Sequence, residues 1–145
     1  MRIGREGEVN IHVLDTSVAI AWYLPEAFSS PARVWQQKLL AGQVQLLVPG
    51  LHYWEFGNVL RTYVRRGELD QGLAQEVYIT HVEAPLTAAE PDLHRILTAA
   101  LEFDATVYDA VYICLALDRE VSLLTAERTT TPWVVKLGER VVSVR

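Results

Sequence analysis

The sequence predicts an α/β fold, a three-layer α/β/α sandwich whose central sheet is mainly parallel. Short apolar runs alternate with longer segments of helical periodicity, which is the pattern of parallel strands joined by helices. The chain has 145 residues, of which 50% are hydrophobic and 21% are charged, enough to build a real core. The sequence contains no repeats, low-complexity segments or Gly/Ser linkers, so we expect residues 1–145 to form one domain.

The first part of the chain supplies two strands and two helices. Residues 9–14 are an apolar run that predicts a buried strand ending at Asp15. Asp15 or the hydroxyl residues after it cap a short helix over residues 16–24. A helix over residues 30–40 is stopped by a glycine, and residues 44–48 form a second apolar strand closed by a proline-glycine pair.

The clearest helix covers residues 51–66. Its apolar side chains recur at intervals of three and four residues, which defines one buried stripe, and Gly67 follows at the position where glycine ends helices. We place Glu55 in the first turn of this helix. A further helix over residues 70–81 and a strand-like stretch at residues 82–86 follow.

The last part of the chain alternates helices with short strands. A helix over residues 91–102 precedes a second one that begins at the cap residue Thr106 and reaches Asp118. Residues 110–117 are nearly all apolar, so we expect the second helix to be buried on all sides. The predicted strands of this part cover residues 121–124, 134–137 and 141–144.

Composition limits the possible functions. The formal net charge of −5 disfavours simple coating of nucleic-acid backbones, although it is compatible with a nuclease whose acidic residues bind metal. The single cysteine, Cys114, excludes an internal disulfide and a cysteine zinc site, and we interpret it as a buried apolar residue. We see neither a signal peptide nor an apolar run long enough to span a membrane, so we expect a cytoplasmic protein.

Four acidic residues stand out, and each has an ordinary explanation on its own. Asp15 suits a helix cap, and Glu55 suits the positive end of a helix dipole. Asp109 follows Thr106 at the spacing of a capping box, although it also opens an otherwise apolar helix. Glu127 suits a surface turn after the strand at residues 121–124.

Together these residues predict a metal site. Asp15 and Glu127 follow strands directly, and the carboxyl ends of parallel strands meet at one edge of the sheet, where ligands bind. Glu55 and Asp109 open helices that can lean over this edge. Carboxylates gathered in one crevice repel one another and require a hard divalent cation or protonation. Oxygen ligands favour Mg²⁺ or Mn²⁺ over zinc.

Four ordered motifs resemble the PIN-domain family, in particular the VapC-type toxin ribonucleases. The motifs are Val13-Leu14-Asp15-Thr16-Ser17-Val18-Ala19 with Trp22-Tyr23-Leu24-Pro25-Glu26, then Trp54-Glu55-Phe56-Gly57-Asn58-Val59-Leu60, then Tyr108-Asp109-Ala110-Val111-Tyr112, and finally Leu123-Leu124-Thr125-Ala126-Glu127. The resemblance spans nearly the whole chain. It implies a PIN-like fold, RNA hydrolysis with Mg²⁺ or Mn²⁺, a cognate antitoxin, and a homodimer or a toxin–antitoxin hetero-oligomer.

One position departs from the family pattern. The family usually has Asp after Thr-Ala in the last motif, where this chain has Glu127, so the carboxylate lies one methylene further out. A displacement of about 1 Å can lower a catalytic rate on the order of a hundredfold. Ser17 and Asn58 resemble family positions near the metal, and each is also explained as an ordinary polar residue of a helix.

For other polar and aromatic residues the sequence gives only weak indications of a functional role. Arg61, Arg65 and Arg66 suit either the negative end of a helix dipole or phosphate contacts. None of the four histidines is predicted to be a metal ligand. The resemblance implies that an antitoxin tail lays an amphipathic segment into an apolar groove. The aromatic residues that could line this groove, although each also suits the core, are Trp22, Tyr23, Trp35 and Trp54.

Two alternatives to a metal-dependent ribonuclease remain open. The first is a phosphotransferase with Asp15 as nucleophile, similar to haloacid-dehalogenase-like phosphatases. Their motif has a second Asp two residues later, where this chain has Ser17, and their late lysine would have to be Lys136. The second is a catalytically impaired PIN-like module that binds RNA or protein.

Overall fold

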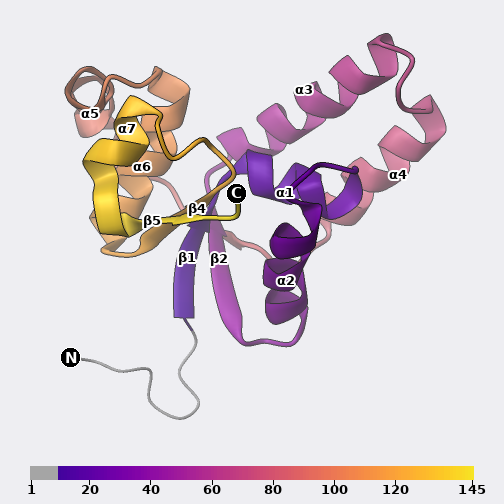
Figure 1. Cartoon of the computed structure of the whole chain (residues 1–145), viewed down its shortest axis with the longest axis horizontal. Helices are drawn as coiled ribbons and strands as arrows, with labels where there is room; N and C mark the ends of the chain where they lie inside the picture. Colours follow the sequence, from indigo (N-terminus) through magenta and orange to yellow (C-terminus); the bar gives the residue numbers. More distant parts are fainter. Residues whose placement is uncertain (1–9) are drawn as a thin grey trace.

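A computed structural model of the chain describes residues 10–145. A five-stranded sheet lies between two layers of helices, which confirms the predicted α/β/α sandwich (Figure 1). The strands are β1 (Asn10–Leu14), β2 (Val44–Val48), β3 (Thr87–Ala88), β4 (Ser122–Thr125) and β5 (Val141–Ser143). The helices are α1 (Thr16–Tyr23), α2 (Ser29–Leu40), α3 (Leu51–Arg65), α4 (Gln71–Val82), α5 (Ile96–Phe103), α6 (Val107–Arg119) and α7 (Pro132–Leu137), with 3₁₀ turns η1 (Leu93–Arg95) and η2 (Gly138–Arg140).

The strand order is β3-β2-β1-β4-β5, and every neighbouring pair is parallel. The chain adds β2 and β3 on one side of β1 and then crosses to the other side for β4 and β5. The direction of winding therefore changes between β1 and β4. In open parallel sheets, the crevice beyond the carboxyl ends of the strands at such a point is where ligands bind.

Alternate residues of the central strands face the two helical layers. Leu14, Leu46 and Leu124 belong to one core with α1, α2, α3 and α4. Their neighbours Val13, Leu47 and Leu123 belong to a second core with α6 and α7. The side-chain period of two in a strand explains this division. Because apolar residues occupy both faces, the strands are continuous apolar runs in the sequence.

Two predicted strands are wrong. The segment at residues 82–86 instead ends α4 at Val82 and continues as a turn, and the third strand comes later, at Thr87–Ala88. The segment at residues 134–137 lies in α7, which begins with a proline at its first position and buries Trp133 and Leu137. Val9, the expected first residue of the first strand, lies outside the described residues.

The remaining expected elements are confirmed, with ends shifted by one to a few residues. Helix α6 is capped as predicted, because the Asp109 backbone N–H donates to Thr106 Oγ1 at 3.0 Å. It buries Ala110, Tyr112 and Cys114, although Tyr108 in its first turn is exposed. None of the helices within residues 10–145 is long and apolar enough to cross a membrane.

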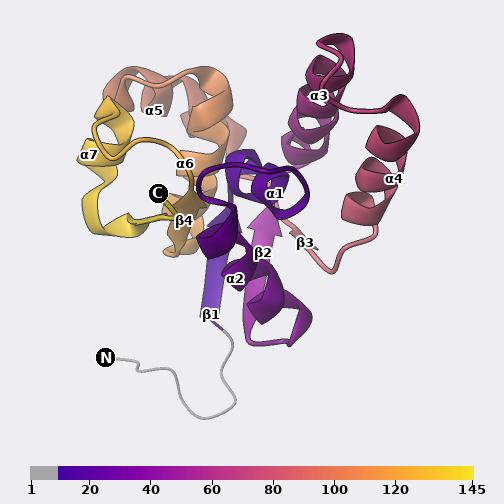
Figure 2. The ribbon, with the colours of Figure 1, turned by 45° about the vertical axis from the view of Figure 1, so that its right-hand side comes forward.

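Helices α3 and α4 form a hairpin that extends away from the sheet (Figures 1 and 2). Helix α3 begins directly after β2, so its first turns lie at the carboxyl edge of the sheet and its last turn lies far from it. Gly67 follows α3 with φ of 73°, a left-handed conformation that glycine adopts at little cost and that the sequence predicted at this helix end.

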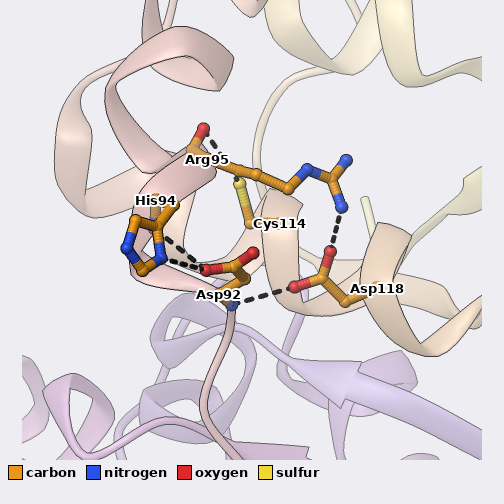
Figure 3. A network of polar contacts seen from close by, with 5 residues as sticks. All are labelled: Asp92, His94, Arg95, Cys114 and Asp118. Atoms are coloured by element: carbon orange, nitrogen blue, oxygen red, sulfur yellow. Dashed lines mark hydrogen bonds and ion pairs between the residues drawn. The ribbon is translucent and has the colours of Figure 1, made fainter.

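A polar network secures the turn before α5 to the far end of α6 (Figure 3). Asp118 forms an ion pair with Arg95 and accepts a hydrogen bond from the Asp92 backbone N–H at 3.0 Å. The buried Cys114 thiol lies 3.8 Å from the Arg95 carbonyl oxygen. Asp118 is near the C-terminus of α6, whereas Asp109 is in its first turn, so this network positions α5 without taking part in the acidic site.

Candidate active site

Four acidic side chains come from elements that meet at the carboxyl edge of the sheet. Asp15 follows β1, Glu127 follows β4, and Asp109 lies in the first turn of α6. Glu55 lies on α3, but in its second turn. Helix α3 begins at Leu51, as expected, but it has no acidic residue in its first turn, so the expected first-turn position of Glu55 was wrong. The macrodipole of α3 therefore does not explain Glu55.

Asp15 is held by two hydroxyl groups. Ser17 and Thr125 each donate a hydrogen bond of 2.8 Å to its Oδ2 atom. The side chain makes no capping bond to α1, so the alternative explanation of Asp15 as a helix cap is not supported. Burial, with smaller contributions from the charges of Asp109 and Glu55, raises the pKa of Asp15 to about 6 against the effect of these hydrogen bonds.

Glu55 is bound through its Oε1 atom by residues of two other helices. Tyr112 donates a hydrogen bond of 2.7 Å from α6, and Thr16 donates one of 3.1 Å from α1. Burial raises the pKa of Glu55, the two hydrogen bonds oppose this, and the nearby charge of Asp109 adds to it. These contacts join α1, α3 and α6 at a single carboxylate and fix where it lies.

Asp109 and Glu127 complete the acidic group. Burial raises the pKa of Asp109, the Thr106 hydrogen bond lowers it, and the charge of Glu127 raises it again. Glu127 Oε1 accepts hydrogen bonds from the Thr131 hydroxyl at 3.1 Å and the Arg128 backbone N–H at 3.3 Å. Its own backbone N–H donates to Thr125 Oγ1, the hydroxyl that binds Asp15. One threonine thus connects both strand ends.

The structure brings the four carboxylates within electrostatic range but not into a shared ligand geometry. In the part of the chain from residue 10 onward, no three His, Cys, Asp or Glu side chains lie close enough together to hold a metal ion jointly. The donors are nevertheless all oxygen atoms. Burial, and to a lesser extent the charges of neighbouring carboxylates, raise the pKa values of Asp15, Glu55 and Asp109, and a divalent cation bound nearby stabilises the ionised form of each. Mg²⁺ commonly binds through one or two carboxylates and retains several waters. The donor set therefore fits such an ion.

A chain of buried polar groups leads from Glu55 into the core, and the sequence did not reveal it. His52 Nδ1 lies 3.3 Å from Thr16 Oγ1, the two Nε2 atoms of His52 and His81 are 2.8 Å apart, and His81 Nδ1 lies 3.0 Å from the Tyr23 hydroxyl. One tautomer of each neutral ring satisfies every contact: Tyr23 donates to His81, His81 to His52, and His52 to Thr16. Thr16 then donates to Glu55.

Both histidines are neutral in this arrangement. Burial lowers the pKa of His52 to about 3, with a further contribution from His81, and it lowers the pKa of His81 to about 4. The only sequence signal was the position of His52 on the buried stripe of α3. Since the two histidines are 29 residues apart, only the packing of α4 against α3 brings them together.

The residues expected to lie near the acidic site differ in what they contact in the structure. Ser17 contacts Asp15, as expected, and it also accepts a hydrogen bond from the Ala126 backbone N–H. Asn58 is exposed on α3, and among the described residues its side chain contacts no acidic group. Thr16, Thr125 and Tyr112 hold the carboxylates directly, although no sequence pattern singled them out.

The four aromatic residues considered for an apolar groove differ in burial, and most of them pack in or against the core. Trp22 is buried in the core, Tyr23 and Trp35 are partly buried, and Trp54 projects from α3 with 77% of its surface exposed. The structure contains a cavity of about 660 Å³ between α3 and α4. Its lining includes the apolar residues Leu60, Val64, Ala74, Tyr78 and Ile79 and the cations Arg61 and Arg65.

Comparison with known proteins decides the family. Residues 12–129 match the sequence profile of the PIN domain, and this segment contains all four acidic residues. The chain is a member of the PIN-domain family. PIN domains are generally nucleases, and they generally use divalent metal ions.

Solved structures agree with this PIN fold. The protein PAE2754 from Pyrobaculum aerophilum aligns with a TM-score of 0.72 and 21% identity, covering 94% of this chain and 84% of its own. A chain from a toxin–antitoxin complex of Klebsiella pneumoniae aligns with a TM-score of 0.60 and 14% identity, covering 92% of this chain and 98% of its own. A comparison with curated proteins finds no match.

Proposed function

We propose that this PIN domain is a Mg²⁺- or Mn²⁺-dependent ribonuclease that hydrolyses RNA phosphodiester bonds. The observation that carries the proposal is the group of carboxylates on either side of the β1–β4 switch point, where burial and the charges of neighbouring carboxylates raise the pKa values of Asp15, Glu55 and Asp109. Without a cation such a group destabilises the fold, so its presence in a PIN domain has a functional explanation. Asp15, Glu55, Asp109 and Glu127 are the proposed catalytic residues.

Each carboxylate has a distinct role in this proposal. Asp15 and Asp109 hold the metal, and Glu127 supports a second metal or a coordinated water. Glu55 binds the metal or orients the attacking water. When bound, the ion lowers the pKa of a water molecule and stabilises charge on the phosphate. Tyr112 and Thr16 keep Glu55 in place, while Ser17 and Thr125 keep the Oδ2 atom of Asp15 fixed.

The proposed biological setting is a type II toxin–antitoxin pair, with this chain as a toxin of VapC type acting in the cytoplasm. Two facts support it: the PIN fold, and the similarity to a chain solved in a toxin–antitoxin complex. The acidic site also suits inhibition by a cognate partner, because an arginine can form a bidentate pair with a carboxylate in place of the metal. A homodimer or a toxin–antitoxin hetero-oligomer is the proposed assembly.

One observation favours a second candidate, a PIN-like module that binds RNA or protein without efficient catalysis. The four carboxylates do not form a ready ligand cluster in residues 10–145, and Glu127 carries its charge one methylene further out than the Asp usual at this position. Such a module would bind RNA but would not cleave it at any metal concentration.

The deciding experiment measures cleavage of a mixed RNA substrate with and without Mn²⁺. The parent should cleave RNA only with metal, and Asp15→Asn and Asp109→Asn should not cleave it while retaining the far-UV circular dichroism of the parent. The control is Glu139→Gln, an exposed carboxylate in the turn before β5 at the opposite edge of the sheet. Undiminished cleavage by Asp15→Asn would disprove the assignment.

The toxin role has a separate test. Expression of the parent chain alone should arrest growth, and co-expression of the adjacent small reading frame should restore it. Asp15→Asn should remove the arrest but should still co-purify with the partner. An arrest of equal strength with Asp15→Asn would show that toxicity has another source.

A further inference from the structure

Helix α3 presents one solvent-exposed face that continues outward from the acidic site. Trp54, Asn58, Arg61 and Arg65 are all exposed. At about 100° per residue their positions fall within about 60° of one another around the helix. The opposite side of α3 carries Phe56 and Leu60, which are buried. This exposed face, which we name the Trp54–Arg65 face, therefore has no structural role in the core.

The Trp54–Arg65 face begins at the acidic site. Trp54 immediately precedes Glu55, whose carboxylate is hydrogen-bonded to α6 and α1. From Trp54 to Arg65 the helix rises roughly 16 Å, which is long enough to contact several nucleotides of an extended strand. Because α3 projects from the sheet, its last turns lie away from the site and away from α5, α6 and α7 (Figure 2).

The charge of the face is the opposite of that of the whole protein. The formal net charge of the chain is −5, yet the face carries two arginines and no carboxylate. Within residues 10–145, no carboxylate lies at ion-pair distance from Arg61 or Arg65, and the pairs found there join Arg95 to Asp118 and His94 to Asp92. Two guanidinium groups that pair with no carboxylate among these residues are suited to phosphate oxygens.

We infer that the Trp54–Arg65 face binds single-stranded RNA, with an unpaired base stacked on the Trp54 indole and backbone phosphates on Arg61 and Arg65. This inference rests on the proposed ribonuclease function, because it supplies the path of the substrate into that site. An exposed indole can stack only on a base that is not already stacked in a duplex. An RNA strand bound in this way leads toward Glu55, the residue that follows Trp54 in the sequence.

Single-stranded RNA fits this face better than a protein segment does. An amphipathic protein helix needs a continuous apolar stripe, whereas this face carries a single large apolar side chain, Trp54, and the apolar residues that line the cavity toward α4, such as Leu60, lie around the helix from it. The Trp54–Arg65 face has one aromatic residue followed by amide and guanidinium groups. That combination of a stacking platform and cations is the one that single-stranded nucleic acids require.

The first experiment measures binding of an oligouridylate of twelve nucleotides to the full-length Asp15→Asn protein at several salt concentrations. Arg61→Ala/Arg65→Ala should weaken binding at low salt and lower the slope of log K against log salt by about 1.4, since each phosphate contact to a single strand contributes about 0.7. The control is Arg119→Ala/Arg140→Ala, which removes the same charge from exposed residues at the other edge of the sheet.

The second experiment tests stacking. Trp54→Ala should weaken binding roughly tenfold or more, and Trp54→Phe should recover part of the loss, because a base stacks on either ring. RNA should quench tryptophan fluorescence in the Asp15→Asn protein but much less in the Trp54→Phe variant. The same oligouridylate paired with oligoadenylate should bind at least tenfold more weakly than the single strand, because its bases are already stacked.

The outcomes separate this inference from the proposed function. If the arginine and Trp54 variants bind RNA as tightly as their background, or the duplex binds equally well, the inference is overturned even where the parent cleaves RNA. That result would indicate that the Trp54–Arg65 face binds a protein partner instead of RNA. If these variants lose binding as expected but the parent never cleaves RNA, the face is supported and the nuclease function fails. Absence of RNA binding at low salt overturns the inference directly.

Discussion

The buried pair His52 and His81 should make folding stability fall as the solution is acidified from pH 8 to pH 5. Both side chains are fully buried, and their pKa values are about 3 and about 4 in the folded protein. In the unfolded chain the pKa of histidine is about 6.5. Below that pH the unfolded state takes up protons that the folded state does not, so the unfolded state is favoured.

The size of this effect follows from the difference in proton uptake. From pH 8 to pH 5, each histidine should lower the free energy of unfolding by about 2 kcal/mol, because the folded ring remains neutral over the whole interval. The pair should together cost about 4 kcal/mol, a large part of the stability of a typical domain. Asp15 changes the stability in the opposite direction. Because its pKa is raised to about 6, the folded state takes up a proton in this pH range, and acidification then favours the folded state.

The variant His81→Gln isolates one histidine. Glutamine keeps a polar side chain near Tyr23 and His52 but cannot become charged. His81→Gln should be less stable than the parent at pH 8, because the stacking of His81 on Phe56 at 4.1 Å is lost. This deficit should shrink by about 2 kcal/mol at pH 5, since the parent alone bears the protonation cost of His81.

Urea unfolding followed by far-UV circular dichroism at pH 8, 7, 6 and 5, in the presence of a chelator, measures the difference. The control is His94→Gln, the same substitution at a histidine whose side chain is 95% exposed. If the deficit of His81→Gln is the same at pH 8 and pH 5, His81 does not remain neutral in the folded protein and the reasoning is refuted.

Three further predictions concern the acidic site. Without metal at pH 8, Asp15→Asn should be more stable than the parent by on the order of 1–2 kcal/mol in urea unfolding, because a carboxylate with a raised pKa destabilises the folded protein once it is ionised. At pH 4 this gain in stability should vanish. A loss of stability in Asp15→Asn at pH 8 would contradict the raised pKa of Asp15. Tyr112→Phe should lower cleavage and cost about 1–3 kcal/mol of stability, because Glu55 loses its 2.7 Å hydrogen bond; unchanged values of both would show that Tyr112 does not position Glu55. Cleavage activity titrated with Mn²⁺ tests Glu127. Glu127→Asp should keep or raise the activity, and Glu127→Ala should need more Mn²⁺ to reach the same activity. A Glu127→Ala titration curve identical to that of the parent would show that Glu127 is only a turn residue.

The sequence by itself determined the α/β fold class and most of its elements. Apolar runs such as residues 44–48 predict strands covered on both faces, and the stripe of α3 predicts a helix with one buried side, because both patterns are set by local geometry. The ordered motifs also selected Asp15, Glu55, Asp109 and Glu127 as the candidate site residues. The two false strands came from short apolar segments, in which helix and strand have similar patterns; at residues 134–137, Pro132 and burial of Trp133 decide for the helix.

Only the tertiary structure decided how the acidic residues are held. Thr125 reaches Asp15 across 110 positions of the sequence, and Tyr112 reaches Glu55 across 57, so neither contact leaves a periodic signal in the chain. The same holds for the polar chain through His52 and His81, since each residue alone resembles an ordinary core position. Sequence patterns record which side of an element is buried, whereas hydrogen bonds and raised pKa values depend on which elements meet, and that is settled only when the helices pack onto the sheet.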